Sequence, residues 1–274
     1  MGLIRFIIYG NVLISLSAGM LSLGLVSFLG LNKATLYFFS VFFATLFIYN
    51  FQRIPRLDEV NDEFSDRHIW LKKNKTILYL LIIVGLVGSV ITYFQFLTVQ
   101  NDLLFLVLIG VVGILYAIKT IKGKALRDFP YLKIHLIALT WILVVIVWPL
   151  IREEIIILNQ LALIVGLYLI MVAITIPFDV RDLSYDDLKK KTMPQVIGIK
   201  WSKIVAVVLL STGYALFVIH AFSLLKNPFF YISFIGFFIL IINSNTKRKE
   251  MYFSGLIDGW VLFLGIMFLF TNGL

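Results

Sequence analysis

The chain has 274 residues, of which 61% are hydrophobic and only 14% are charged, and its formal net charge is +9. A soluble domain of this length carries nearly twice that share of charged residues, so the composition excludes an ordinary soluble globular protein. The chain contains no cysteine, which excludes disulfides and thiolate metal sites.

Apolar stretches of about twenty residues recur along the chain, each long enough to cross a membrane as a helix. They are continuously apolar rather than alternating, which favours helices over a membrane barrel. No soluble domain interrupts them. We therefore predict an all-α polytopic membrane protein with a single domain over residues 1–274. The nine predicted spans are 7–30, 34–54, 76–98, 103–119, 132–151, 155–177, 202–224, 228–243 and 253–271.

Basic residues gather in alternate loops. Of the 24 Lys and Arg residues, 20 follow spans two, four, six and eight. Cytoplasmic loops of membrane proteins carry such an excess. We therefore predict an integral protein of the cell (plasma) membrane, with its N-terminus and its acidic loops in the cytoplasm. Membrane lipids are its expected surroundings, and no nucleic-acid partner is expected.

The loop after span two is rich in acids, with Asp58, Asp62 and Asp66 spaced four residues apart. On a helix this spacing stacks the three carboxylates on one side. They either contribute to a cation site or belong to a solvated amphipathic helix that pairs with Arg56, Arg67 and Lys72. The sequence alone leaves both interpretations open.

The segment after span six carries the clearest chemical signal. Acids near a bilayer usually serve an ion, a substrate or a proton path. Asp179, Asp182 and Asp186 share one face of a helix, where they repel each other unless a cation lies between them. A hard divalent cation such as Mg²⁺ takes oxygen ligands and often bridges to a substrate phosphate. The alternative is a solvated acidic loop beside basic residues.

Two acidic clusters on one face of the membrane suit a metal–diphosphate substrate. Loss of diphosphate from an allylic carbon leaves a carbocation. A metal ion can neutralise the negative charge of the departing diphosphate. Aromatic faces stabilise such a cation. The 25 Phe, 12 Tyr and 5 Trp supply these faces, although aromatic residues are also ordinary packing residues.

These motifs resemble the UbiA superfamily of intramembrane prenyltransferases, over nearly the whole chain. That family has nine transmembrane helices around a central cavity and aspartate-rich motifs after helices two and six. Its second motif reads D-x-x-D-x-x-x-D, followed by a K-x-T-x-P-type tail and a Gly. The matching residues here are Asp179, Asp182, Asp186, Lys190, Lys191, Thr192, Pro194 and Gly198. The resemblance implies that the three aspartates hold Mg²⁺.

The first motif of the family, N-D-x-x-D-x-x-x-D with a later Arg, is matched only in part. Asn50 fits the Asn, Asp58 fits the last Asp, and Arg67 fits the later Arg. Phe51 and Ile54 stand where the first two aspartates are expected, and neither side chain can ligate Mg²⁺. The resemblance therefore implies metal binding at this motif by Asp58.

The activity that the resemblance implies is Mg²⁺-dependent transfer of an isoprenyl group from a polyprenyl diphosphate to an aromatic or other lipid-like acceptor. The residues expected to bind the substrate are Asn50, Arg67, Tyr116, Lys119, Lys122, Arg181 and Lys190. The altered first motif leaves a second interpretation open: a non-catalytic member that binds a prenyl lipid or a partner protein. A small transporter has less support, because the acids gather at one face rather than at mid-membrane.

Overall fold

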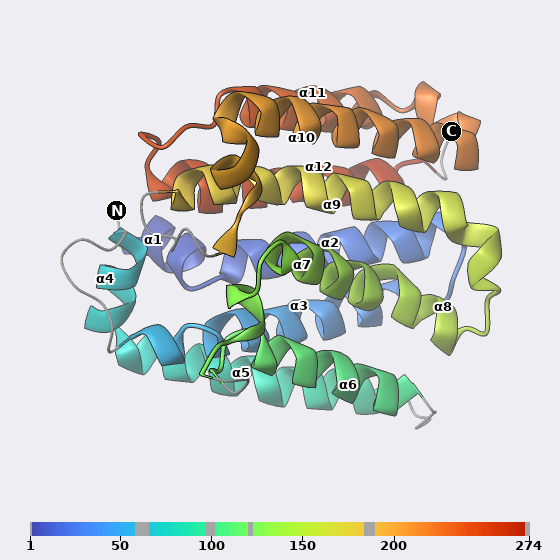
Figure 1. Cartoon of the computed structure of the whole chain (residues 1–274). Coiled ribbons are helices and arrows are strands. Elements are labelled where there is room, and N and C mark those ends of the chain that lie inside the picture. Colours follow the sequence, from blue (N-terminus) through green and yellow to red (C-terminus); the bar gives the residue numbers. More distant parts are fainter. Residues whose placement is uncertain (1, 58–65, 97–101, 120–122, 184–189, 272–274) are drawn as a thin grey trace.

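The computed structural model describes residues 2–57, 66–96, 102–119, 123–183 and 190–271 (Figure 1). These residues form helices and no strand, which confirms the predicted all-α class. Within them, six helices are long and apolar enough to cross a membrane, or seven if the bent pair α1 (Gly2–Tyr9) and α2 (Val12–Phe28) is one span. The shorter apolar helices α6 (Asp102–Leu115) and α11 (Pro228–Ile242) occupy the places of predicted spans four and eight. The count of nine spans therefore remains a prediction.

The long helices lie side by side along one axis, and contacts between neighbours form a closed circuit (Figure 1). The helices of this circuit are, in order, α2, α3 (Ala34–Phe51), α6, α8 (Trp148–Arg152), the π-helical turn η3 (Leu143–Val147), α7 (Leu132–Ile142), α9 (Leu161–Asp182), α10 (Met193–His220), α11 and α12 (Asp258–Leu269). Helix α5 (Lys75–Phe94) packs on α3, and the short α4 (Asp66–Lys73) lies at one end of the bundle. The closed circuit brings the N-terminal and C-terminal helices into contact.

Glycines set the closest approaches in this circuit. Gly24 of α2 and Gly265 of α12 lie so close that a Cβ on Gly24 would overlap the carbonyl group of Gly265. Gly166 of α9 and Gly213 of α10 meet in the same way. Small residues let membrane helices pack backbone to backbone, where dispersion contacts replace the missing hydrophobic driving force.

Two predicted spans differ from the observed helices. Span one bends by 55° where α1 gives way to α2, because Asn11 has a left-handed backbone with φ of 61°. Predicted span seven begins at residue 202, whereas α10 begins at Met193. Gly198 kinks α10 with φ of 77°, a conformation that glycine adopts without steric penalty. Of the predicted tail, Pro194 and Gly198 thus lie in the first part of this kinked helix, whereas Lys190, Lys191 and Thr192 precede it.

Candidate functional site

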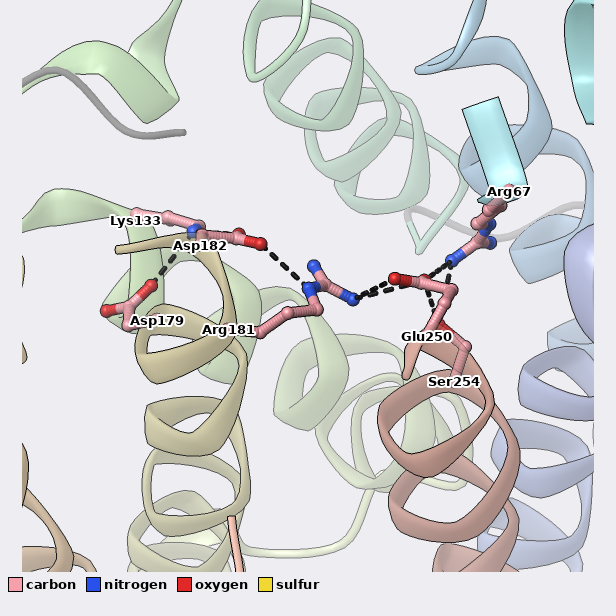
Figure 2. Close-up of polar contacts among 7 residues, drawn as sticks. All are labelled: Arg67, Lys133, Asp179, Arg181, Asp182, Glu250 and Ser254. Atoms are coloured by element: carbon pink, nitrogen blue, oxygen red, sulfur yellow. Dashed lines mark hydrogen bonds and ion pairs between the residues drawn. The ribbon is translucent and has the colours of Figure 1, made fainter. Parts of the chain in front are cut away.

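Two of the predicted metal ligands meet at the end of α9. Asp179 and Asp182 lie three residues apart in its last turns, and both carboxylates contact the ammonium of Lys133 at the start of α7. The Lys133 Nζ lies 2.8 Å from Asp179 Oδ1 and 2.9 Å from Asp182 Oδ2. The predicted shared helix face of these two aspartates is therefore present, and a lysine lies between them (Figure 2).

Arg181 extends this cluster toward the last helix. Its Nε donates to Asp182 Oδ1 at 2.7 Å, and its Nη1 donates to both oxygens of Glu250, at 3.1 and 3.2 Å. The guanidinium also lies over the rings of Phe178 and Phe253, at 5.1 and 5.5 Å from their centroids. Arg181 is thus fixed from four sides, by two carboxylates and two aromatic faces.

Arg67 approaches Glu250 from the opposite side (Figure 2). Its Nη1 lies 3.6 Å from Glu250 Oε1 and donates to Ser254 Oγ at 3.1 Å, while its Nη2 donates to Asn11 Oδ1. Asn11 in turn donates to Asn50 Oδ1 at 2.9 Å. These contacts form a continuous chain of polar side chains from α3 to α9, which we call the polar chain. Its members are Asn50, Asn11, Arg67, Ser254, Glu250, Arg181, Asp182, Lys133 and Asp179.

Burial and charge oppose each other at Glu250. Burial raises the pKa of its carboxyl group, but the charges of Arg181 and Arg67 outweigh burial and hold the pKa below its ordinary value. Burial lowers the pKa of the Arg67 guanidinium, and the charge of Glu250 offsets only part of that change. Since arginine stays protonated in proteins, the pair is ionised at neutral pH.

An apolar pocket of about 420 Å³ lies between α3, α5, α6 and α7. Such a volume is within the usual range for small-molecule sites. Its walls are mostly aliphatic and aromatic, with a few polar groups that include Gln52, Tyr116 and Thr140. Leu136 and Ile137 of α7 also line it, three and four residues after Lys133, so they lie one helical turn from the polar chain on the same side of α7.

A buried ion pair closes the far end of this pocket. Asp102, at the start of α6, accepts hydrogen bonds from Arg152 Nη1 at 2.6 Å, Trp148 Nε1 at 2.8 Å and Tyr93 Oη at 3.0 Å. Trp148 and Tyr93 also line the pocket. At the other end of α6, the Gly113 carbonyl accepts a hydrogen bond from Gln52 at 2.9 Å. Helix α6 is therefore held near both ends, with the pocket behind it.

A second, smaller pocket of about 210 Å³ lies beside Lys133. It is lined by Lys133, Asp179, Lys190 and Arg127 together with apolar residues of α10. Lys190 also lies 3.6 Å from Asp128. This pocket places Lys190 near Asp179 of the second acidic motif.

The structure separates the predicted site residues into groups. Asn50, Arg67 and Arg181 belong to the polar chain, with Asp179 and Asp182, whereas Tyr116 lines the apolar pocket. Lys119 is exposed and lies outside both groups. The predicted site residues that lie outside the described ranges are Asp58, Lys122 and Asp186.

The two substituted positions of the first motif have packing roles. Ile54 packs on a small buried cluster of Leu57, Leu71 and Leu78, which holds α4 against α5. Phe51 packs against Phe47, with 5.8 Å between ring centroids. Apolar side chains at these positions thus contribute to the fold of this end of the bundle.

The described carboxylates do not fit a divalent metal as they stand. Within the described residues, no group of three His, Asp or Glu side chains is placed to hold a metal ion. Asp179 and Asp182 have Lys133 between them, and Glu250 is paired with two arginines. The predicted magnesium site accordingly remains a prediction, since Asp58 and Asp186 lie outside the described ranges.

Four members of the polar chain are not among the residues that the sequence predicts for the site: Lys133, Glu250, Asn11 and Ser254. In the sequence, Lys133 is one of the many basic residues that follow the even-numbered spans. Glu250 and Asn11 each carry a signal, because a polar residue at the edge of or within an apolar run usually has a partner or a function. Nothing in the sequence names those partners.

Comparison with solved structures finds a chain described as digeranylgeranylglyceryl phosphate synthase, from work on its structure and mechanism in membranes. The match has a TM-score of 0.56 and 18% sequence identity, and it covers 98% of this chain and 99% of that chain. At this identity the likeness shows a shared fold, in agreement with the predicted all-α membrane bundle. No protein-family model and no curated protein matches the sequence.

Proposed function

We propose that this protein binds an isoprenyl diphosphate and transfers its isoprenyl group to a lipid-like or aromatic acceptor. The observation that carries the proposal is the apolar pocket, because its lining helices α3 and α7 also carry Asn50 and Lys133 of the polar chain. A ligand that suits both features has a long apolar part and an anionic head. Isoprenyl diphosphates have this composition.

The head group is assigned to the three cations Arg67, Arg181 and Lys133. The Nε of Arg67 is buried and donates no hydrogen bond within the described part of the chain, so this nitrogen offers a donor for an anion. Guanidinium groups recognise phosphate oxygens with charge-assisted hydrogen bonds. Since Arg67 and Arg181 already share Glu250, phosphate oxygens would compete with that carboxylate for the same donors.

The isoprenyl chain is assigned to the apolar pocket. Burial there excludes water, which would otherwise intercept an allylic cation. In the transfer, the bond between C1 and the diphosphate oxygen breaks, and its electron pair leaves with diphosphate. An electron pair of the acceptor forms the new bond to C1, and the acceptor then loses a proton. The cations of the polar chain stabilise the charge that develops on the departing diphosphate.

The structural neighbour supports a lipid as the acceptor class. It is named as the synthase of digeranylgeranylglyceryl phosphate, which is itself a lipid with isoprenoid chains. We take a lipid-like or aromatic acceptor as the proposal for this chain. We assign magnesium no part in this transfer, because the described carboxylates already have cationic partners. Its predicted role through Asp58 and Asp186 is tested by omitting the metal from the assay.

The test is binding and turnover by the purified protein in lipid nanodiscs. Isoprenyl diphosphates of increasing length are titrated with and without Mg²⁺, and release of pyrophosphate is followed as candidate acceptors are added. Arg181→Gln should weaken binding by about tenfold or more, the scale of losing hydrogen bonds to a charged group. Lys200→Gln, which removes an exposed cation of α10, is the matched control and should leave binding unchanged. Failure of a well-folded protein to bind any isoprenyl diphosphate would refute the proposal.

One observation favours the alternative of a non-catalytic lipid-binding protein. The first motif has apolar packing residues at Phe51 and Ile54, and the described acids of the second motif are paired with cations. Under this alternative, isoprenyl diphosphates bind but no acceptor triggers release of pyrophosphate. The same assay therefore separates the two functions.

A further inference from the structure

The feature that leads beyond the proposed function is the position of the Lys133 ammonium. Its Nζ contacts one oxygen of Asp179 at 2.8 Å and one oxygen of Asp182 at 2.9 Å. The Asp179 side chain is only 2% exposed, and the Lys133 and Asp182 side chains are 17% and 21% exposed. Lys133 therefore lies at the point between the two carboxylates where a bridging cation would be expected.

The remaining oxygen of Asp182 is also engaged by a cation. Asp182 Oδ1 accepts from Arg181 Nε at 2.7 Å, while Oδ2 faces Lys133. Asp182 thus has a cationic partner on each oxygen. A divalent ion that bound Asp182 would have to displace at least one of these partners.

Charge balance leads to the same conclusion. The ion-paired part of the polar chain contains three carboxylates, Asp179, Asp182 and Glu250, and three cations, Lys133, Arg181 and Arg67. A divalent cation added beside these pairs would bring further positive charge to carboxylates that already have cationic partners. Such charge is strongly unfavourable unless a cation leaves or an anion enters.

The Lys133 ammonium and a divalent ion cannot occupy the position between Asp179 and Asp182 together, because their distances to the carboxylate oxygens differ. Mg²⁺ requires oxygen ligands at about 2.0–2.1 Å, well inside the distances that the ammonium keeps from these carboxylates. We propose that Lys133 is a built-in counter-cation that occupies the divalent-ion position between Asp179 and Asp182, so that this acidic pair binds no divalent metal while Lys133 is present. This inference concerns the metal-binding property of the pair and holds whether or not the protein transfers isoprenyl groups.

The test measures binding of Mn²⁺ alone, by electron paramagnetic resonance of the purified protein without substrate. Mn²⁺ is added up to about 1 mM, the weak end of the range for protein divalent sites. The Asp179→Asn variant should bind the same amount of Mn²⁺ as the unchanged protein. Lys133→Met removes the ammonium and keeps an unbranched side chain, so this variant should bind one additional Mn²⁺ per chain. The added ion should be lost in the double variant Lys133→Met with Asp179→Asn.

Lys133→Arg is the matched control, since it keeps the positive charge and should gain no ion. The proposal is overturned if Asp179→Asn lowers Mn²⁺ binding by the unchanged protein, or if a folded Lys133→Met variant gains no ion. If Lys133→Met does not fold, Lys133→Gln replaces it; if neither folds, the comparison of the unchanged protein with Asp179→Asn decides. Because no isoprenyl diphosphate is present, the outcome is independent of the test of the proposed function.

Discussion

Arg152 and Asp102 form a buried ion pair at the far end of the apolar pocket, with 2.6 Å between Arg152 Nη1 and Asp102 Oδ2. Neither side chain is more than 4% exposed. The guanidinium also lies 4.3 Å from the centroid of the Phe96 ring. The pair joins the start of α6 to the end of α8.

Removing one partner of this pair should destabilise the protein. Asp102→Asn leaves the Arg152 charge buried without its carboxylate, which costs about 3 kcal/mol in comparable buried pairs. The thermal unfolding midpoint in detergent should fall, whereas Glu154→Gln, at an exposed acid of the neighbouring loop, should leave it unchanged. The double variant Asp102→Leu with Arg152→Met should be less destabilised than Asp102→Asn. An unchanged midpoint for Asp102→Asn would show that the ion pair does not hold α6.

Filling the apolar pocket should separate chain binding from head-group binding. Ala44 lines the pocket, and Ala44→Phe places a ring in space assigned to the isoprenyl chain. Exclusion of two methylene groups removes about 1.6 kcal/mol, so binding of a long isoprenyl diphosphate should weaken by about tenfold or more. Binding of inorganic pyrophosphate should not change. Leu80→Phe, on the exposed face of α5, is the control; equal affinities for Ala44→Phe and the unchanged protein would place the chain elsewhere.

The ion pairs of Glu250 should contribute stability that depends on pH. Its folded-state pKa lies below the ordinary value of 4.5, so its contribution is present above pH 4.5 and is lost as the pH falls through the folded-state pKa. The difference in unfolding midpoint between the unchanged protein and Glu250→Gln should therefore be large at pH 7 and should shrink below pH 4.5. A difference that is constant with pH would show that Glu250 contributes through packing rather than through its charge.

Restoring acids to the first motif should weaken the fold. Ile54→Asp places a carboxylate against the cluster of Leu57, Leu71 and Leu78, and we expect a loss of about 3 kcal/mol. Thr76→Asp, at an exposed position in the first turn of α5, should be tolerated. The same measurement is made for Phe51→Asp with Ile54→Asp in the presence of Mg²⁺. Full recovery of stability with Mg²⁺ would show that this motif needs only its two acids to form a metal site.

The predicted membrane orientation can be tested because the chain has no native cysteine. Single cysteines in place of Lys73, Lys124 and Lys190 should resist an impermeant thiol reagent in intact cells, since these positions are predicted to be cytoplasmic. A cysteine in place of Lys226 should react. Labelling of the Lys73 or Lys190 position from outside would refute the predicted orientation.

The helical class and the approximate positions of the helices follow from the sequence by itself. A continuous apolar run in a membrane must satisfy its backbone hydrogen bonds within one segment, so its composition alone specifies a helix. The shared face of Asp179 and Asp182 follows as well, because a spacing of three residues fixes their relative direction on a helix. The bend at Asn11 and the kink at Gly198 do not follow, since each depends on a single backbone conformation.

The partners within the polar chain were decided only by the tertiary structure. Lys133 belongs to α7, and Asp179 and Asp182 belong to α9, so their meeting depends on how these two helices pack. Glu250 meets Arg67 and Arg181 because the closed circuit of helices brings the last helix beside the first. Sequence spacing fixes directions within one helix, whereas the charge that faces a carboxylate across a bundle is set by helix packing. For this reason the sequence predicted a cation between the two aspartates, and the fold placed a lysine there.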